Sequence, residues 1–276
     1  MKRLLTGAIA LPLLILFILK VSVFLFACFV FLVVLLGLSE FYRMALPDRK
    51  VVGQVASLSG ALFTFVLASP ESLQRFIQFP GGNGVLFFSF TVAFLVVAIF
   101  FLFSIRDIRQ SATEMALLWS GIAYVPLLLS HLVLLRALPS GVEWVFLMLL
   151  IVMSGDTAAY YVGSSLGKRK LYPSVSPNKS IEGALGGLCG SLVGTFAAKL
   201  TFFPALTVAD CVVTALAVGA IGQLGDLFES LLKRSFGVKD SGAIIPGHGG
   251  ILDRLDSILF AAPALYYYAS LIVLAR

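Results

Sequence analysis

The chain has 276 residues, of which 59% are hydrophobic and 12% are charged, and its mean hydropathy is +1.02. A soluble domain of this length could not bury so much apolar surface, so the composition excludes a soluble globular protein. The formal net charge of +6 does not indicate nucleic-acid binding, because in a membrane protein an excess of Lys and Arg is typical of cytoplasmic loops.

The apolar runs predict a helical membrane protein. They are long and unbroken, whereas a membrane β-barrel would show short alternating segments. We expect an all-α, polytopic membrane helix bundle with about nine transmembrane helices, although Lys20 alone separates the first two and eight stays an alternative. The predicted spans are Leu4–Leu19, Val21–Leu38, Val51–Ser69, Gly84–Phe103, Met115–Leu135, Val142–Val162, Ile181–Phe202, Leu206–Leu232 and Arg254–Leu274.

The distribution of positive charge predicts the orientation of these spans. With the N-terminus in the cytoplasm, 15 of the 20 Lys and Arg residues fall inside and five outside, as the positive-inside rule requires. We expect residues 1–276 to form a single integral membrane domain. Residues 1–140 carry no recognisable motif, and residues 141–276 are expected to carry the catalytic site.

Two polar segments interrupt the apolar pattern, and both are expected to face the cytoplasm. The first runs from Ser154 to Gly187 and places Asp156 inside an otherwise apolar helix. A buried carboxylate without a partner is costly or stays protonated, so we expect a metal or a basic group beside it. The same segment holds five further candidate substrate contacts: Lys168, Ser176, Lys179, Ser180 and Glu182.

Two features of this segment also have simpler explanations. A cluster of cations at residues 168–170 is what the positive-inside rule predicts at the end of a span. Ser180 is expected to cap the helix that follows, whose free N–H groups would favour an anion.

The second polar segment, residues 222–256, is the densest group of ionisable residues in the chain. On a helix, Asp226, Ser230 and Lys233 are spaced i, i+4 and i+7 and therefore share one face. The loop that follows is rich in glycine, which allows a backbone to approach a ligand and present N–H groups to phosphate oxygens. The candidate substrate contacts in this loop are Lys239, Asp240, His248, Gly249 and Gly250.

Asp253 and Asp256 follow at the start of the last predicted helix, at i and i+3 on one face. Paired carboxylates suit a divalent cation, and oxygen ligands favour Mg²⁺. Helix capping and a favourable interaction with the helix dipole would explain either aspartate alone. A pair that lies beside a His-Gly-Gly sequence and opposite Asp226 favours a metal site.

The motif Ser230-x-x-Lys233-Arg234, Lys239-Asp240 and Pro246-Gly247-His248-Gly249-Gly250-x-x-Asp253-Arg254-x-Asp256 resembles the C-terminal signature of phosphatidate cytidylyltransferases, also called CDP-diacylglycerol synthases. Residues 156–183 resemble the family's second polar region. The resemblance implies a nucleotidyltransferase of phospholipid biosynthesis that transfers CMP from CTP to phosphatidate, giving CDP-diacylglycerol and pyrophosphate. It also implies a homodimer, which we expect in the bacterial inner membrane with its active site facing the cytoplasm.

The resemblance further implies roles for individual residues. Asp226, Asp253 and Asp256 would bind Mg²⁺, and the sequence leaves open whether a second cation binds. These three aspartates, Lys233 and Arg234 are the predicted catalytic residues. Contacts to the nucleotide and the phosphates are expected from Lys233, Arg234, Lys239, His248 and Arg254, and the remaining predicted substrate contacts in this segment are Ser230, Asp240, Gly249 and Gly250.

Two rival functions fit parts of the same pattern. A secondary transporter for an anionic substrate would also have buried carboxylates and glycine-broken helices, but the chain shows no internal repeat and its polar groups gather at one face. The family that transfers phosphoalcohols from CDP-linked lipids has its aspartates at a different spacing and lacks the Pro-Gly-His-Gly-Gly sequence.

Overall fold

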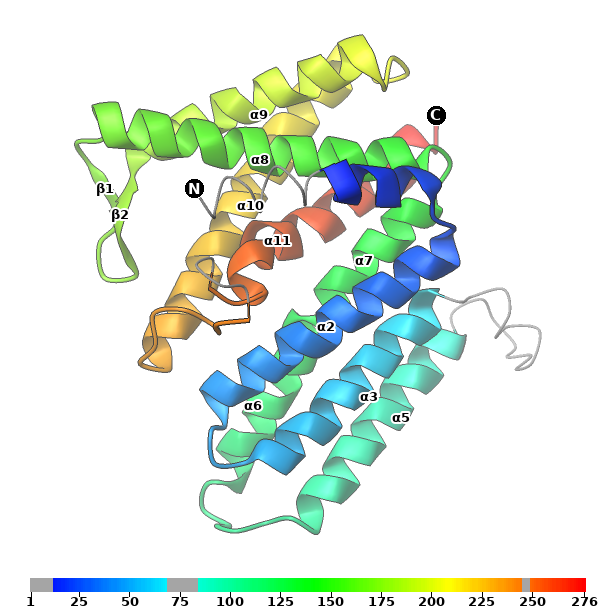
Figure 1. The fold of residues 1–276 in the computed structure, drawn as a ribbon, viewed down its shortest axis with the longest axis vertical. Helices are drawn as coiled ribbons and strands as arrows, with labels where there is room; N and C mark the ends of the chain where they lie inside the picture. The colour runs from blue at the N-terminus through cyan, green and yellow to red at the C-terminus, as the bar shows by residue number, and fades with distance from the viewer. Residues whose placement is uncertain (1–11, 69–83, 245–248) are drawn as a thin grey trace. The chain divides into compact units, whose positions relative to one another are not determined.

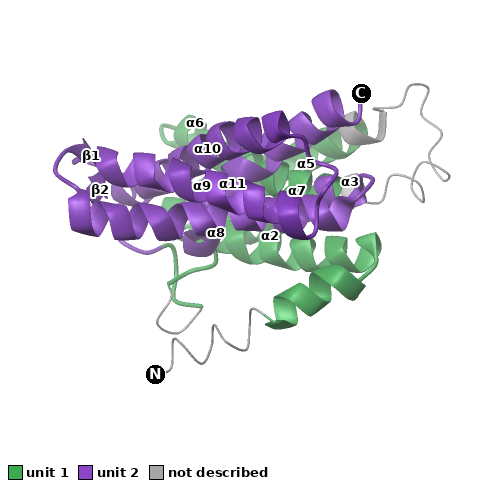
Figure 2. Cartoon of the chain, turned by 90° about the horizontal axis from the view of Figure 1, so that it is seen from above, with its two compact units in different colours: residues 1–134, 241–251 green, residues 135–240, 252–276 purple. Residues whose placement is uncertain are grey.

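The computed structural model describes residues 12–68, 84–244 and 249–276, and most of these residues are helical (Figure 1). The chain divides into two compact units (Figure 2). Unit 1 comprises residues 1–134 and 241–251, and unit 2 comprises residues 135–240 and 252–276. Both polar segments therefore belong to unit 2, except for residues 241–251 of the glycine-rich loop.

Several helices confirm an integral membrane protein. Six helical stretches in the described part of the chain are long and apolar enough to cross a bilayer. Outward-facing apolar side chains are consistent with contact to lipid: Leu185, Val193 and Leu200 on one of these helices expose 58%, 70% and 81% of their surfaces. The six stretches are Val23–Ala45, Ser111–Ala137, Gly141–Leu166, Ile181–Thr201, Val208–Ser235 and Leu252–Val273.

Six candidate spans do not establish the predicted total of nine transmembrane helices. Residues 12–20 are helical, but the rest of the first predicted span, Leu4–Leu19, lies outside the described residues. The third and fourth predicted spans correspond to helices α3 (Lys50–Ala68) and α5 (Gly84–Leu102). The number of helices that cross the membrane therefore stays a prediction.

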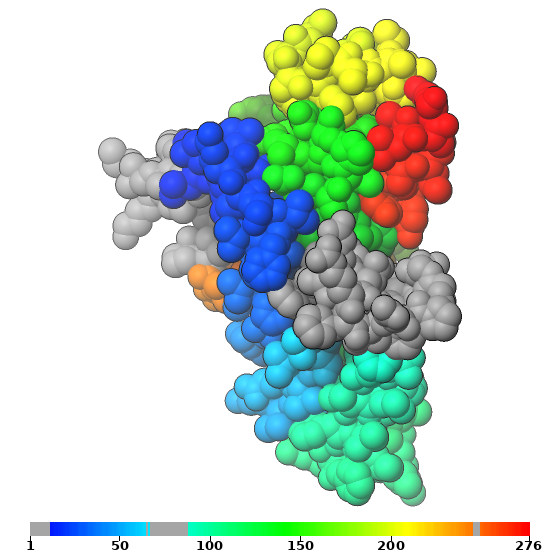
Figure 3. Space-filling model, turned by 90° about the vertical axis from the view of Figure 1, so that its right-hand side faces the viewer, coloured from blue at the N-terminus to red at the C-terminus, as the bar shows by residue number. Residues whose placement is uncertain are grey.

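Unit 1 is a bundle of helices. Helix α3 packs against α2 on one side and α5 on the other, as Figures 1 and 3 show. The predicted span Met115–Leu135 forms two helices, because Pro126 lacks the N–H that would continue the first and is well suited to begin the second. Besides the helical residues 12–20, this unit contains α2 (Val23–Ala45), α6 (Ser111–Tyr124) and most of α7 (Pro126–Ala137), whose last three residues belong to unit 2.

Unit 2 combines four long helices with a short hairpin that the sequence did not predict. Strands β1 and β2 pair antiparallel, with Lys170 opposite Ser180 and Tyr172 opposite Ser176. The hairpin connects the end of α8 directly to the start of α9. The elements are α8 (Gly141–Leu166), β1 (Lys170–Tyr172), β2 (Ser176–Ser180), α9 (Ile181–Thr201), α10 (Val208–Ser235), α11 (Leu252–Tyr268) and the π-helical turn η1 (Ala269–Val273).

Glycines allow α8 and α9 to approach closely. A Cβ at Gly183 would lie 3.0 Å from the Ala159 carbonyl oxygen and 3.1 Å from the Gly163 Cα, so a side chain there would force the helices slightly apart. A Cβ at Gly186 would collide with Val162 in the same way. Small residues at helix–helix contacts are the usual means of association in membranes, where the hydrophobic effect between helices is weak.

The approach of α11 to α10 depends on Gly225. A Cβ at this position would lie 2.6 Å from the Asp256 carbonyl oxygen and 3.0 Å from the Phe260 Cβ. Gly225 immediately precedes Asp226, so the close contact brings two of the predicted metal ligands to neighbouring places on facing helices.

Candidate active site

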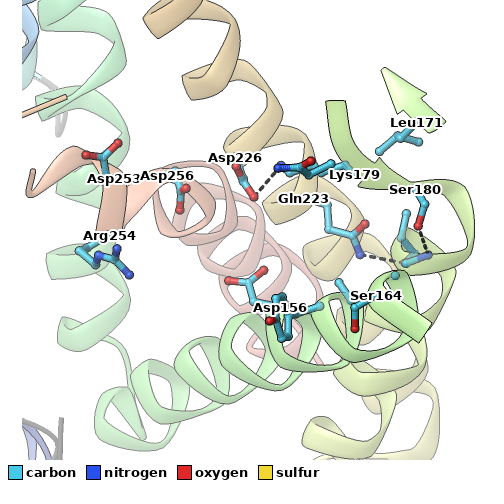
Figure 4. Close-up of a pocket in the computed structure, with 16 residues that line it drawn as sticks. Asp156, Ser164, Leu171, Lys179, Ser180, Gln223, Asp226, Asp253, Arg254 and Asp256 are labelled. Carbon is cyan, nitrogen blue, oxygen red and sulfur yellow. Dashed lines mark hydrogen bonds and ion pairs between the residues drawn. The ribbon is translucent and has the colours of Figure 1, made fainter. Parts of the chain in front are cut away.

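A cavity of about 650 Å³ opens in unit 2 where the two polar segments meet (Figure 4). Helices α8, α10 and α11 and the start of α9 line it together with the hairpin. Its size lies within the range of small-molecule pockets. Seven predicted site residues line this cavity: Asp156, Lys179, Ser180, Asp226, Asp253, Arg254 and Asp256.

Three helices each contribute a carboxylate to the cavity. Asp156 comes from α8, Asp226 from α10 and Asp256 from α11, and Figure 4 shows them around a common space. The three are close enough to interact electrostatically with one another. The predicted convergence of Asp226 with the α11 aspartates is therefore present, and Asp156 from the first polar segment joins them.

Lys179 supplies the basic group that we expected near Asp156. Its Nζ lies 2.6 Å from Oδ2 of Asp226, and its charge also acts on Asp156. Both side chains of the ion pair are partly exposed to the cavity, at 28% and 30%. A lysine from β2 therefore partly neutralises the carboxylates of two helices.

Lys233 holds two carboxylates in a second ionic cluster. Its Nζ lies 2.5 Å from Oε2 of Glu229 and 2.6 Å from Oδ1 of Asp253. The three side chains expose 12%, 1% and 9% of their surfaces, so the cluster is largely shielded from solvent. This arrangement ties α10 to the first turn of α11 and orients Asp253, which also lines the cavity.

The chemistry of the donors fits a hard divalent cation. Neither Asp156 nor Asp256 forms a direct ion pair with a described residue; the nearby charge of Lys179 acts on Asp156, and the Ser257 amide donates a hydrogen bond to Asp256. A carboxylate within an apolar protein is costly unless its charge is balanced, so a cation would stabilise both. Carboxylate oxygens are the ligands that Mg²⁺ prefers. However, no three His, Cys, Asp or Glu side chains in the described part of the chain are already gathered to hold a metal ion. Metal binding by Asp226, Asp253 and Asp256 therefore stays a prediction.

Local hydrogen bonds shape the wall formed by the hairpin and α9. The Ser180 hydroxyl accepts a hydrogen bond from the Gly183 amide at 3.1 Å, which confirms that Ser180 caps this helix. The Glu182 carboxylate accepts from the amides of Lys168 and Arg169 at 3.0 and 3.1 Å. Glu182 thus fastens the start of the hairpin to α9, and it is not among the residues that line the cavity.

The other predicted site residues that the structure describes are not among the residues that line the cavity. Arg234 donates to the Val238 carbonyl at 3.3 Å, just beyond the end of α10, and Lys239 and Asp240 are exposed in the loop that follows. Gly249 adopts a positive φ of 79°, which favours glycine. His248 lies outside the described residues. The remaining predicted contacts that do not line the cavity are Lys168, Ser176, Ser230, Lys233 and Gly250.

Glu229 and Gln223 are among the residues of the site region that were not predicted from the sequence. Glu229 is an acid within an apolar helix, four residues before Lys233, so the argument that singled out Asp156 applies equally to it. Gln223 lines the cavity and donates from Nε2 to the Ala184 carbonyl at 3.1 Å. Its position three residues before Asp226 on α10 was the available signal, since i and i+3 share a face.

Comparison with known proteins now decides the family. The profile of the cytidylyltransferase family matches residues 1–272, which is nearly the whole chain. The chain belongs to the cytidylyltransferase family. This membership agrees with the resemblance found in residues 230–256, and the match extends it to the N-terminal helices, where the sequence showed no motif.

Curated cytidylyltransferases are similar over most of their length. The phosphatidate cytidylyltransferase of Bacillus subtilis (strain 168) is 33% identical over 273 residues, which cover 98% of this chain and 97% of the relative. That of Staphylococcus epidermidis (strain ATCC 12228) is 35% identical over 263 residues, covering 95% and 96%. That of Staphylococcus aureus (strain COL) is 43% identical over 157 residues, covering 57% and 60%.

Proposed function

We propose that this chain is a phosphatidate cytidylyltransferase, which transfers CMP from CTP to phosphatidate and releases pyrophosphate. The observation that carries the proposal is the cavity of unit 2, which is lined by carboxylates from three helices together with Lys179 and Arg254. Similarity to phosphatidate cytidylyltransferases over 98% of the chain supports the choice of substrates.

The reaction depends more on neutralising the negative charge of the two substrates than on proton transfer. An oxygen of the phosphatidate phosphate forms a bond to the α-phosphorus of CTP, while the bond from that phosphorus to the oxygen bridging the β-phosphate breaks. The attacking phosphate is already anionic near neutral pH, so no strong base is needed. The obstacle is repulsion between two polyanions, which fixed positive charge relieves.

We assign the neutralisation of charge to specific groups. Arg254 and Lys179, which line the cavity, would contact phosphate oxygens, and Lys179 would exchange its ion pair with Asp226 for the substrate. Mg²⁺, when bound, would polarise the transferring phosphoryl group and favour departure of pyrophosphate. The residues that would hold it are the carboxylates that line the cavity: Asp156, Asp226, Asp253 and Asp256.

The location of the site suits one water-soluble and one lipid substrate. CTP is cytoplasmic and phosphatidate lies in the membrane leaflet, so the cavity should open at the inner face of the membrane. The bias of positive charge supports this orientation, and the similarity to bacterial relatives supports a place in the inner membrane. The apolar runs of the sequence support a nine-helix protomer, and the resemblance to the family supports a homodimer.

Incorporation of radiolabelled CTP tests the activity directly. Purified protein in detergent, given CTP, phosphatidate and Mg²⁺, should form a chloroform-extractable labelled product. Product should be absent when phosphatidate is omitted, and it should be lost on addition of EDTA and regained with excess Mg²⁺. Absence of labelled lipid under all conditions, from folded protein, would overturn the proposal.

The same assay separates the rival functions. A secondary transporter would release no pyrophosphate from CTP in detergent, where no compartments exist. A phosphoalcohol transferase would consume a CDP-linked lipid and leave CTP intact. The phosphatidate cytidylyltransferase should release one pyrophosphate for each labelled lipid formed.

A further inference from the structure

Glu40 of α2 is a buried acid that the predicted site does not include. Its side chain is completely buried within unit 1. Inside an apolar protein an ionisable group is costly unless polar groups surround it, so its retention needs an explanation. The explanation lies in residues 241–251, which belong to the same unit.

The Glu40 carboxylate contacts both ends of this segment. Oε2 accepts a hydrogen bond from the Ser241 hydroxyl at 3.1 Å, and Oε1 accepts one from the Ile251 amide at 3.0 Å. These partners are more than 200 positions away along the chain. One carboxylate therefore fixes the two ends of a single loop against α2.

Two glycines of the loop lie directly against the same carboxylate. A Cβ at Gly242 would lie 2.8 Å from the Glu40 Cδ, and a Cβ at Gly250 would lie 2.7 Å from it. Real side chains do not approach so closely, so a methyl group at Gly242 or Gly250 would displace the Glu40 carboxylate from its hydrogen bonds. The backbone thus encloses the carboxylate from both ends of the segment.

We propose that Glu40 is a positioning residue for nucleotidyl transfer, because it holds Ser241 and Ile251, the two ends of the glycine-rich loop, in place. Ile251 immediately precedes α11, and Asp253 and Arg254 follow within that helix's first turn. Fixing the Ile251 amide therefore fixes the chain directly before two residues that line the cavity. The inference rests on the proposed function and gives the N-terminal half of the chain a part in it.

A double-mutant cycle tests the contact. Gly242→Ala should lower kcat/KM for CTP by roughly tenfold or more in the wild-type background, because its methyl group displaces the carboxylate from its hydrogen bonds. In the Glu40→Ala background the colliding atoms are gone, so Gly242→Ala should cause little further loss. Independent, multiplicative effects of the two substitutions would overturn the proposal.

The KM for CTP separates positioning from folding. Glu40→Ala should raise this KM by roughly tenfold, whereas loss of folded protein would reduce the maximal rate and leave KM unchanged. Ser39→Ala is the matched control, since the Ser39 hydroxyl donates to the Leu36 carbonyl of its own helix, and it should keep the wild-type KM. A wild-type KM in Glu40→Ala would refute the role.

The two proposals fail in different ways. If the wild-type protein forms no labelled lipid from CTP and phosphatidate, the proposed function is wrong. If the wild-type protein is active but Glu40→Ala and Gly242→Ala act independently, the enzyme assignment stands and the positioning role of Glu40 is wrong.

Discussion

Lys233 holds the carboxylates of Glu229 and Asp253 together, so its removal should affect folding before it affects substrate binding. We expect Lys233→Met to lower the free energy of unfolding by about 3–5 kcal/mol, because it leaves buried carboxylates without a counter-charge. Combining it with Glu229→Gln should restore part of this loss, since one of the orphaned charges is removed. Thermal unfolding in detergent measures both effects.

The neighbouring cation is the control for this prediction. Arg234 is exposed and donates to a backbone carbonyl, so Arg234→Met should change stability by no more than about 0.5 kcal/mol. Equal unfolding temperatures for the Lys233 and Arg234 variants would show that the buried cluster contributes nothing to stability.

Asp256 and Asp210 provide a matched pair for the predicted metal site. Asp256 lines the cavity, whereas Asp210 is held by Tyr268 and Arg276, at 2.6 and 3.1 Å. We expect Asp256→Asn to raise the Mg²⁺ concentration for half-maximal rate at least about tenfold, and Asp210→Asn to leave it unchanged. An identical Mg²⁺ dependence in Asp256→Asn and wild type would exclude Asp256 as a ligand.

The chemical character of the site could be predicted from single residues, but their pairings could not. A carboxylate in an apolar helix demands a partner, and this rule identified Asp156 before its neighbours were known. The pairings depend on how the helices pack, which the sequence does not show. Lys179 pairs with Asp226, and Lys233 pairs with both Glu229 and Asp253. For the same reason Glu40 could not be linked to residues 241–251 from spacing alone.

At the scale of elements, the close contact between α10 and α11 leads us to expect different effects of alanine at Gly222 and Gly225, which lie one helical turn apart on α10. Gly225→Ala should destabilise the protein by about 1–3 kcal/mol and reduce activity, because its methyl group would push against the Asp256 carbonyl. Gly222→Ala meets its nearest atom at an ordinary 3.5 Å and should be neutral or stabilising by up to about 1 kcal/mol. Thermal unfolding and CTP turnover of both variants test this, and equal behaviour would contradict it.

Long helices were predictable because each apolar run exceeds the thickness of the bilayer, as α8, α9 and α10 show. The hairpin of β1 and β2 was not predictable, since its five-residue second strand contains Pro177 and the chain just before β1 is held by the Glu182 carboxylate of α9. The division at Pro126 could have been read from the sequence, because proline inside a predicted helix marks an interruption.

At the scale of the whole molecule, the orientation of α10 determines the side of the membrane from which CTP reaches the cavity. This helix has 28 residues, which corresponds to about 42 Å at 1.5 Å per residue, longer than the hydrocarbon core of about 30 Å. Its two ends should therefore emerge on opposite sides. The cavity lies toward its C-terminal half, at Gln223 and Asp226, so the side on which that end emerges is the side from which CTP enters.

Single cysteines at the two ends of α10 test this orientation. In a background with Cys28, Cys189 and Cys211 replaced by Ala, Lys239→Cys should react with a membrane-impermeant maleimide in inside-out vesicles and not in right-side-out vesicles. Ala205→Cys should show the opposite pattern; both native residues are exposed in loops that flank the helix. The expectation follows from the excess of Lys and Arg on the predicted cytoplasmic side. Labelling of Lys239→Cys from the outside would place the cavity away from cytoplasmic CTP and would contradict both the orientation and the proposed route of the nucleotide.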